Sequence, residues 1–196
     1  MLDPKRRSFL ALVSGVAAAV AATRSKAGAT PQVESFMLPP SGPMPNNPRL
    51  PVLLFRQVLP AGDDPPAACE ALFRGNGWPP QWRAGVFGFH HYHSTAHEAL
   101  GFVRGGTRLM LGGPGGHVID VRAGDVAVLP TGTGHCNMTP GSDLLVVGAY
   151  PPDQTWDICR ASPDPAAVRR MAALPFPARD PVEGAAGPLT RLWPSD

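Results

Sequence analysis

Three histidines and a glutamate in the middle of the chain have the residue types and the spacing of a metal site. His91 and His93 are two residues apart, so in a β-strand their side chains lie on the same face, about 7 Å apart. Glu98 opens the next apolar stretch, and after a tight turn its carboxylate can face the two imidazoles from a neighbouring strand. His135, directly after the glycine-rich turn PTGTG, can supply a third imidazole.

This donor set predicts one divalent transition metal ion. Imidazole nitrogens with one carboxylate oxygen suit Fe, Mn, Ni, Co, Cu or Zn, and coordination positions stay open for a substrate or dioxygen. Neutral imidazoles and one glutamate leave a divalent site with a net charge of about +1, which favours an anionic or oxygen-donor ligand. His97 is an alternative ligand, since it could replace His91 or Glu98 in a pair with His93. We do not expect the remaining two histidines, at positions 90 and 117, to bind the metal.

The residues around this site predict short β-strands. From Arg83 onward, apolar segments alternate with glycine-containing turns, and several short strands at close spacing are typical of an all-β sandwich or barrel. If Phe87 and Phe89 fill the interior, His91 and His93 point inward as well. The predicted strand segments are 85–93, 98–103, 107–111, 117–121, 125–129 and 144–150.

The segments on either side have other patterns. Residues 51–59 form a short apolar run that predicts a first strand. Residues 65–75 and 165–174 begin with proline and carry an apolar face, which predicts two helices. The rest of the tail has no periodicity, and we expect it to pack along the barrel. The side chains expected to make this contact are Leu189, Leu192 and Trp193.

The first 29 residues resemble a twin-arginine export signal. The pair Arg6 and Arg7 precedes an uncharged run over 8–23, and the sequence AGA at 27–29 is a small-x-small cleavage site. The run is shorter than the about 18–20 apolar residues of a bilayer span. We therefore expect recognition by the twin-arginine export machinery, cleavage after Ala29, a periplasmic or secreted protein, and no stable membrane span after cleavage. The alternatives are an uncleaved anchor and a basic-start helix of the folded domain.

Proline placement divides the remainder of the chain. Of the 25 prolines, only three fall in 84–149, so the compact core is expected over about 84–150. Residues 30–50 contain six prolines and no periodicity, and we expect a linker or an arm lying across the domain. The domain itself is expected over 51–196, with the C-terminal helix and tail in 151–196.

Charge and cysteine content exclude two classes of protein. Residues 30–196 carry 12 basic and 14 acidic side chains, so nothing suggests the basic face that nucleic acid requires. The chain has three cysteines, Cys69, Cys136 and Cys159, and they form no CxxC or zinc-finger spacing. We therefore expect neither a disulfide scaffold nor a thiolate zinc site. In an oxidising compartment one disulfide could link Cys136 and Cys159, and the alternative is three small buried apolar side chains.

The predicted metal ligands also fit the two sequence motifs of the cupin family. The first motif, G(X)5HXH(X)4E(X)6G, and the second, G(X)5PXG(X)2H, are filled at every fixed position, with 18 residues between them. At the end of the second motif Thr139 stands where the family pattern has asparagine, and Asn137 lies two residues early, which concerns the turn rather than a metal ligand. The matching residues are Gly85, His91, His93, Glu98 and Gly105 in the first motif, and Gly124, Pro130, Gly132 and His135 in the second.

Residues 77–193 further resemble the YjlB-type single-domain bacterial cupins. The resemblance implies an RmlC-like jelly roll, a double-stranded β-helix, with short flanking helices and the metal near the barrel mouth. It implies that Glu98 is mainly a ligand, although in some cupins the matching glutamate also moves protons and is catalytic. Family precedent implies a homodimer formed by sheet edges or by the N-terminal arm.

The resemblance implies no particular reaction, so we carry three hypotheses. The first is a metalloenzyme acting on a small molecule, with dioxygenase-like oxidation ahead of decarboxylation and isomerisation. The second is an exported protein that binds a metal or small ligand without turnover. The third is a structural β-barrel whose histidines no longer bind a metal. A further acid or base in the cavity would favour the first, but the sequence offers none, because Asp120 and Asp125 lie in turn contexts.

Other side chains have expected places around the site. Tyr92 is out of phase with the ligands, so we expect a structural role. We expect four apolar side chains in the core and the cavity wall: Phe87, Phe89, Phe102 and Met110. Two tryptophans are expected either at the barrel mouth or in the core: Trp82 and Trp156. Three arginines are expected at a solvated rim or in contact with an anionic substrate: Arg83, Arg104 and Arg108.

Overall fold

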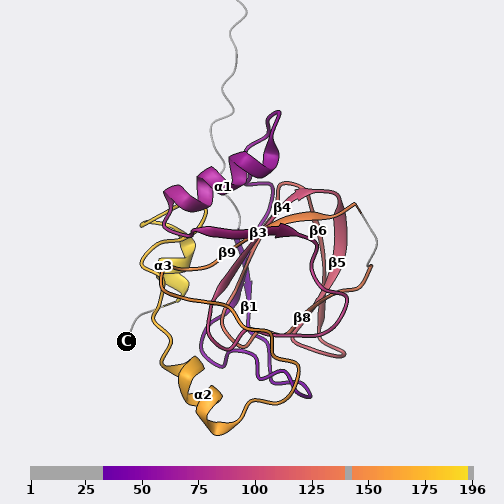
Figure 1. Ribbon diagram of the computed structural model, residues 1–196, viewed down its shortest axis with the longest axis vertical. Helices are drawn as coiled ribbons and strands as arrows, with labels where there is room; N and C mark the ends of the chain where they lie inside the picture. Colours follow the sequence, from indigo (N-terminus) through magenta and orange to yellow (C-terminus); the bar gives the residue numbers. More distant parts are fainter. Residues whose placement is uncertain (1–32, 140–142, 194–196) are drawn as a thin grey trace, which may run out of the picture.

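Two antiparallel β-sheets pack face to face in the computed structural model, which describes residues 33–139 and 143–193 (Figure 1). The larger sheet has the order β1-β2-β7-β4-β9-β3, and the smaller has the order β6-β5-β8. The strands are β1 (Val33–Phe36), β2 (Val52–Phe55), β3 (Pro80–Ala84), β4 (Glu98–Arg104), β5 (Gly106–Leu111), β6 (His117–Arg122), β7 (Val126–Leu129), β8 (His135–Asn137) and β9 (Leu145–Ala149). The helices are α1 (Pro65–Gly75), α2 (Pro165–Ala172) and α3 (Pro188–Leu192). This arrangement confirms the fold class predicted from the sequence, an all-β jelly roll.

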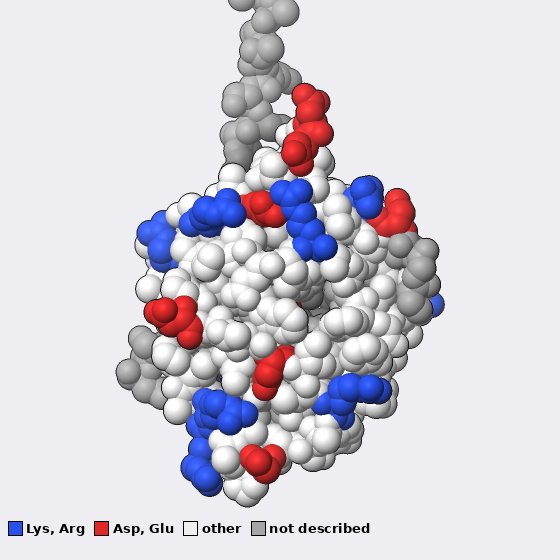
Figure 2. Space-filling view, in the orientation of Figure 1, with Lys and Arg blue, Asp and Glu red and all other residues white. Residues whose placement is uncertain are grey.

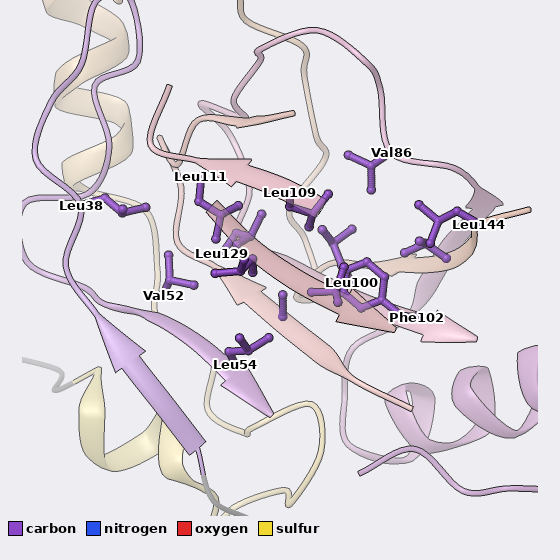
Figure 3. Packing of buried hydrophobic residues seen from close by; sticks show 14 residues of the cluster. Leu38, Val52, Leu54, Val86, Leu100, Phe102, Leu109, Leu111, Leu129 and Leu144 are labelled. Carbon is purple, nitrogen blue, oxygen red and sulfur yellow. The ribbon is translucent and has the colours of Figure 1, made fainter. Parts of the chain in front are cut away.

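The larger sheet is buried on both faces, which explains its continuous apolar strands. In β4, Leu100 and Phe102 point toward the smaller sheet, while Ala99 and Val103 point to the opposite side. The first pair belongs to the core between the sheets (Figure 3). The second pair belongs to an outer cluster that is covered by α1, α3 and the C-terminal tail (Figure 1). Alternation along β4 therefore decides which side chains can reach the barrel interior.

Helix α1 covers the outer face of the larger sheet through a close approach to β4. Its bounds match the helix predicted over 65–75, and Cys69 and Phe73 are its buried residues. A Cβ atom at Gly101 would lie 2.4 Å from the Sγ of Cys69, so this strand position admits only glycine at the observed spacing. The predicted C-terminal helix is also confirmed, although it ends at Ala172 rather than at residue 174.

The predicted strand over 85–93 is wrong. Only two isolated bridges occur there, between His91 and His135 and between Tyr92 and Cys159. Phe87 and His91 are four positions apart, but their backbone partners Asn137 and His135 are only two positions apart, so the segment bulges and cannot continue a ladder.

The bulge also changes which side chains are buried. Phe87 is 46% exposed, so it is not the core residue that was predicted, and Val86 is buried in its place. Phe89 is half-buried, and Met110 is half-buried on β5, whereas Phe102 is fully buried as expected.

Within the proline-rich stretch 30–50, the described residues from 33 onward lie against the domain, as an arm would, rather than extending from it as a linker. Strand β1 pairs with β2, and Leu38, Met44 and Asn46 are buried. The side chain of Asn46 donates to the carbonyl of Gly112 and accepts from the backbone N–H of Gly134, which ties this stretch to the loops beside β5 and β8. The sequence missed this strand because prolines flank it and its four residues are too few for a pattern.

Three other elements were not predicted as such. Strand β3 begins with proline and lies at a sheet edge, where proline is tolerated. Strand β8 and helix α3 have only three and five residues. Leu189 and Trp193 are nevertheless buried in the outer cluster, with Leu192 packed against it, so the predicted contacts of the tail are present.

Two further sequence predictions concern export and the cysteines. The predicted signal segment 1–29 lies outside the described residues. Within the part of the chain that is described, no helix combines the length and the apolar character needed to cross a membrane. Cys69, Cys136 and Cys159 are all free, so the optional disulfide is absent from the structure.

Candidate metal centre

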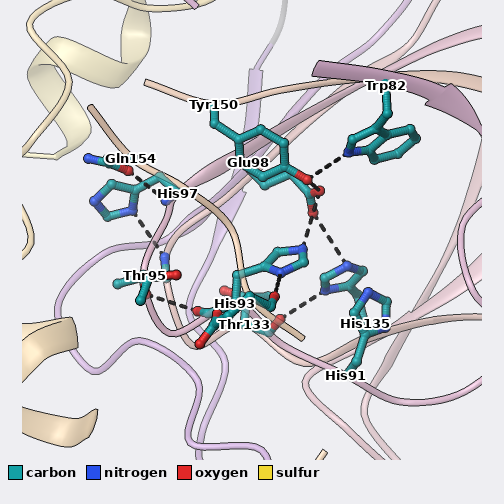
Figure 4. A network of polar contacts seen from close by, with 12 residues as sticks. Trp82, His91, His93, Thr95, His97, Glu98, Thr133, His135, Tyr150 and Gln154 are labelled. Carbon is teal, nitrogen blue, oxygen red and sulfur yellow. Dashed lines mark hydrogen bonds and ion pairs between the residues drawn. The ribbon is translucent and has the colours of Figure 1, made fainter. Parts of the chain in front are cut away.

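Three buried imidazoles converge at one end of the barrel interior (Figure 4). His91 and His93 come from the bulged segment, and His135 is the first residue of β8. Each residue offers a ligand atom within 4.8 Å of those of the other two. The ring centroids of His91 and His135 are 4.0 Å apart, and those of His93 and His135 are 5.3 Å apart. The structure thus brings together the three histidines that the sequence selected.

The outer nitrogen of each of these imidazoles faces a backbone carbonyl. The three Nδ1-to-oxygen pairs are His91 with Phe89 at 3.1 Å, His135 with Thr133 at 3.0 Å, and a short contact of His93 with Asp157. A carbonyl oxygen can only accept, so each Nδ1 carries a proton, and the Nε2 of each ring, once unprotonated, is the atom that faces the cluster as a ligand. Carbonyl partners of this kind fix the tautomer and orientation of metal-binding histidines.

Glu98 adds a carboxylate to the same centre. It is the first residue of β4 and points inward with Leu100 and Phe102. Its Oε1 lies 3.3 Å from Nε2 of His93, and its Oε2 lies 3.3 Å from Nε2 of His135.

Electrostatics keep this carboxylate ionised and two of the imidazoles neutral. Burial alone would raise the pKa of Glu98, but His93, His135 and a hydroxyl partner outweigh it and lower the pKa to about 2. Burial, and then the neighbouring His91, lower the pKa of His135 to about 3. Burial likewise lowers the pKa of His91. For His93 burial acts in the same direction, but Glu98 and the Asp157 carbonyl raise its pKa above the ordinary value.

These residues fit a divalent transition metal. Among the described residues, the Nε2 of His93 and the Oε2 of Glu98 are buried without a hydrogen-bond partner. Such atoms are costly unless another group satisfies them, and a cation satisfies both. Three imidazole nitrogens and one carboxylate oxygen are donors that first-row metals accept. His91, His93, His135 and Glu98 would therefore hold the ion.

Tyr150 is a functional candidate that the sequence analysis missed. Its hydroxyl donates to Glu98 Oε1 at 2.5 Å, and it accepts from the indole nitrogen of Trp82 at 2.8 Å. Burial and the Glu98 charge raise the pKa of Tyr150, so the phenol keeps its proton. Alternation could have found it, because Val146, Gly148 and Tyr150 share the inner face of β9.

Asp157 is a second missed residue, and it supports His93 from outside the cluster. Its carboxylate accepts from the backbone N–H of Ser94 at 2.6 Å and from the Ser94 hydroxyl at 2.5 Å. These bonds hold the 157 loop against the 93–94 segment, so the Asp157 carbonyl stays in place behind Nδ1 of His93. Nothing in the sequence marks a backbone carbonyl as a partner.

A cavity of about 200 Å³ opens beside the cluster. Trp82 and Trp156 line it, so of their two expected positions they take the barrel mouth. Phe87 lines it too, although it was predicted as a core residue. The walls are otherwise apolar, apart from the cluster and the Tyr150 hydroxyl.

His97 lies outside the cluster, so it is not the alternative ligand. It directly precedes Glu98, and successive residues point to opposite sides of the chain (Figure 4). Its Nδ1 accepts from the backbone N–H of Thr131, and its ring packs between Phe176 and Trp193. Burial lowers the pKa of His97 to about 3.

The other expected neighbours of the site have structural roles. His117 is exposed and packs on Phe36, and the Tyr92 hydroxyl donates to the carbonyl of Ala161. His90 is half-buried and outside the cluster. The three arginines considered for substrate binding do not line the cavity: Arg83 pairs with Glu70, Arg104 donates to the carbonyl of Asp143, and Arg108 is exposed.

The chain has a relative of known sequence in Bacillus subtilis. The uncharacterized protein YjlB of strain 168 is 31% identical over 164 residues, a match that covers 83% of this chain and 97% of YjlB. The chain belongs to the YjlB family. No protein-family model matches it.

Solved structures resemble this YjlB-family chain only distantly. An oxalate decarboxylase structure is 18% identical, over 55% of this chain and 22% of that one, with a TM-score of 0.30. A cupin 2 domain-containing protein from Halorhodospira halophila is 14% identical, over 78% and 82% of the two chains, with a TM-score of 0.28. Streptomyces albus HEPD, solved with 2-hydroxyethylphosphonate and Fe(II), is 14% identical over 74% and 28%, with a TM-score of 0.25. At TM-scores this low, the likeness says nothing about what the chain binds or catalyses.

Proposed function

We propose that this chain is an exported metal-binding cupin that works as a metal-dependent enzyme on a small molecule, with dioxygenase-like oxidation as the leading reaction. One observation carries the proposal. Three buried imidazoles present Nε2 lone pairs to one point, with each Nδ1 held by a carbonyl and with the Glu98 carboxylate beside them. A divalent metal bound there would supply Lewis acidity and, if redox-active, a binding position for dioxygen.

The chain's own residues provide orientation and a dry environment for such chemistry. The carbonyls behind the histidines keep the rings from turning, and the Tyr150 hydroxyl holds one oxygen of Glu98. Aromatic side chains around the cavity exclude water, which strengthens every electrostatic interaction inside it. In oxidative ring or C–C cleavage both atoms of dioxygen enter the substrate and the substrate supplies all four electrons, so no separate reductant is needed.

Tyr150 supports catalysis over mere binding. A group that carries a proton beside the reaction centre is what a turnover site needs and what a storage site does not. The Tyr150 phenol remains protonated and lies 2.5 Å from Glu98, whose carboxylate remains ionised. The Tyr150 hydroxyl therefore keeps its proton and donates a hydrogen bond that stabilises the negative charge on Glu98 Oε1. Glu98 would thus act mainly as a ligand.

The alternative is an exported protein that binds a metal or small ligand without turnover. The apolar walls of the cavity favour this reading, because they provide few groups that could take part in chemistry. Oxygen consumption distinguishes the two. We expect the Fe(II)- or Mn(II)-loaded protein to consume dioxygen with one of a panel of small organic probes, and a loaded protein that binds a probe without consuming dioxygen would support the alternative.

The control for this experiment removes a metal ligand and leaves the aromatic walls of the cavity in place. His135→Ala deletes one of the three imidazoles, and its oxygen uptake should fall to that of the buffer with free metal. Equal uptake by the variant would show that the reaction does not depend on this centre and would overturn the proposal.

Export and assembly are further parts of the proposal. The sequence Arg6-Arg7 followed by a modestly apolar run supports twin-arginine export to the periplasm or outside the cell. Replacing both arginines by lysine should leave the precursor in the cytoplasm, and unchanged fractionation would contradict that route. Homodimer formation by sheet edges or by the N-terminal arm follows family precedent, and size-exclusion chromatography with light scattering of residues 30–196 tests whether a dimer forms.

A further inference from the structure

We propose that the cavity beside the metal centre takes a single-ring aromatic molecule with one or two adjacent oxygen donors, of the phenol or 1,2-dihydroxybenzene class. This inference rests on the proposed function, because the oxygen donors are assigned to the metal. It specifies the substrate class of the same site. Size, wall composition and charge each point to this class.

The walls of the cavity are mostly rings. Trp82, Phe87, Tyr150 and Trp156 all line it. The Tyr150 and Trp156 rings are nearly parallel, with centroids 6.1 Å apart and an angle of 21° between their planes. Trp156 also meets the ring of His93 edge to face, at 6.0 Å. A planar aromatic ligand can make the same stacked and edge-to-face contacts with these rings, whereas a saturated ring cannot.

Two inward residues shape this wall. A Cβ atom at Gly148 would lie 2.0 Å from the Trp82 indole, so the glycine is what lets that ring lie flat over β9. The Trp82 N–H is satisfied by the Tyr150 hydroxyl, so the indole presents carbon atoms rather than a polar group to the cavity. The Trp82 face is therefore available for stacking.

The cavity has room for one ring. Its volume is about 200 Å³. A cavity of about 150 Å³ with apolar walls is enough for benzene, and drug-sized ligands need about 300 Å³ or more. A benzene ring with one or two hydroxyl groups therefore fits inside the cavity, whereas a drug-sized ligand does not.

Charge argues against ligands that carry a second negative charge away from the metal. No lysine or arginine is among the residues that line the cavity in the described part of the chain. The nearby Arg83 pairs with Glu70 at 2.5 Å, and Arg160 lies over the Phe89 ring, 4.6 Å from its centroid, where Phe89 itself stacks on Phe87. The face seen in Figure 2 is hollowed near its middle, and mostly uncharged residues surround the hollow. A dicarboxylate or a phosphonate would find no partner for its second charge.

Polar groups are confined to the metal side of the cavity. The lining residues with polar side-chain atoms, apart from the two tryptophans, are His91, His93, Glu98, His135 and Tyr150. Leu100, Val86 and Phe87 contribute only apolar atoms. A ligand that is apolar over most of its surface and carries its oxygen atoms at one edge matches this division. Phenols and 1,2-dihydroxybenzenes have that form.

Binding to protein loaded with redox-inactive Zn²⁺ tests the inference without turnover. The probe is catechol, the matched saturated control is cis-1,2-cyclohexanediol, and the anionic control is succinate. We would measure heat by isothermal titration calorimetry and quenching of tryptophan fluorescence, since two of the four tryptophans line the cavity. We expect one catechol per chain, bound at least about tenfold more tightly than either control. Equal affinity for the diol, or tighter binding of succinate, would overturn the proposal.

Two variants locate the site. Phe87→Ala removes one wall ring, and we expect it to weaken catechol binding about tenfold. Met37→Ala is the matched control, because Met37 is 48% exposed, Phe87 is 46% exposed, and Met37 does not line the cavity. We expect both variants to fold and only the first to lose affinity. If both variants bind catechol like the parent, the ligand lies elsewhere and the inference fails.

The experiment separates this inference from the proposed function. One equivalent of bound zinc without catechol binding would overturn the aromatic substrate class and leave the metal centre intact. Failure to bind zinc would overturn the metal centre. In that case catechol quenching of the metal-free protein still tests the aromatic cavity, because stacking needs no metal.

Discussion

Replacing Tyr150 by phenylalanine removes one oxygen atom from the second layer of the proposed metal centre. That oxygen donates to the ionised Glu98 at 2.5 Å and accepts from the Trp82 indole at 2.8 Å. A hydrogen bond to a charged group contributes about 1.5–3 kcal/mol, and the indole N–H left without an acceptor costs about 1 kcal/mol more. We therefore predict that Tyr150→Phe lowers the free energy of unfolding of the metal-free protein by about 3 kcal/mol.

The same change should weaken metal binding. Glu98 loses the group that orients one of its oxygens, and the loss of such outer partners typically costs about 10–100-fold in metal affinity. The hydroxyl also lowers the pKa of Glu98, so the carboxylate becomes somewhat easier to protonate in the variant. Urea denaturation of the metal-free protein measures the first effect, and competition with a chelator of known affinity measures the second.

Tyr92→Phe is the matched control for both measurements. Tyr92 is as buried as Tyr150, and its hydroxyl donates to the Ala161 carbonyl at 2.9 Å, away from the cluster. The neutral acceptor predicts a smaller loss of about 1 kcal/mol and no change in metal affinity. Equal stability losses together with unchanged metal affinity in both variants would refute the role that we assign to Tyr150.

Three further predictions follow from the same geometry. His135→Ala should abolish the rise in melting temperature that added metal produces, whereas His117→Ala, an exposed residue, should keep it; equal responses would place the metal elsewhere. Metal binding near pH 6 should displace about one proton. Among the three imidazoles of the cluster, only His93 has a raised pKa, so only His93 must lose a proton before it binds. Affinity should then fall about tenfold per pH unit below the pKa of His93, and a loss of about a thousandfold per unit in pH-dependent titrations would mean that all three imidazoles are protonated there. Gly148→Ala should destabilise the protein by about 1–3 kcal/mol, because the new Cβ meets the indole 2.0 Å away, while Gly85→Ala, whose nearest contact is at 3.9 Å, should be close to neutral in urea denaturation.

Much of the candidate site could be predicted from spacing in the sequence. The two motifs selected His91, His93, Glu98 and His135, and the structure brings all four together. The physical reason offered for the first pair was nevertheless wrong. We expected a regular strand to aim both rings inward, whereas a bulged segment with one bridge to β8 positions them. A bulge depends on the register of a partner strand, which one sequence does not display.

For other parts of the site, some features could have been predicted from the sequence and others could not. The exclusion of His97 follows from alternation, since adjacent residues cannot both face the cavity, and so does the inward position of Tyr150 directly after β9. The support of His93 by the carbonyl of Asp157 could not have been found, because the two residues are 64 positions apart and a backbone oxygen has no residue signature.

The elements of the fold divide in the same way, into those that apolar periodicity predicts and those that depend on tertiary contacts. The central strands and helix α1 were predictable because their apolar periodicity reflects a core that covers both faces of the larger sheet. Helix α2 was predictable from its proline start, although it contributes no residue to either core cluster. Strand β1 was not, since its partner β2 supplies the hydrogen bonds and its burial is slight. Tertiary contacts, rather than local sequence, decide whether so short a segment becomes a strand.

The metal content of the untagged protein, residues 30–196, purified from its native compartment, tests the central claim most directly. Elemental analysis of the parent chain and of His93→Ala decides it. We predict about one equivalent of a first-row transition metal per parent chain, and much less in the variant, because three imidazoles and Glu98 form a single centre. No metal in the parent after reconstitution with Fe(II), Mn(II), Ni(II), Cu(II) or Zn(II), or equal metal in both proteins, would contradict it.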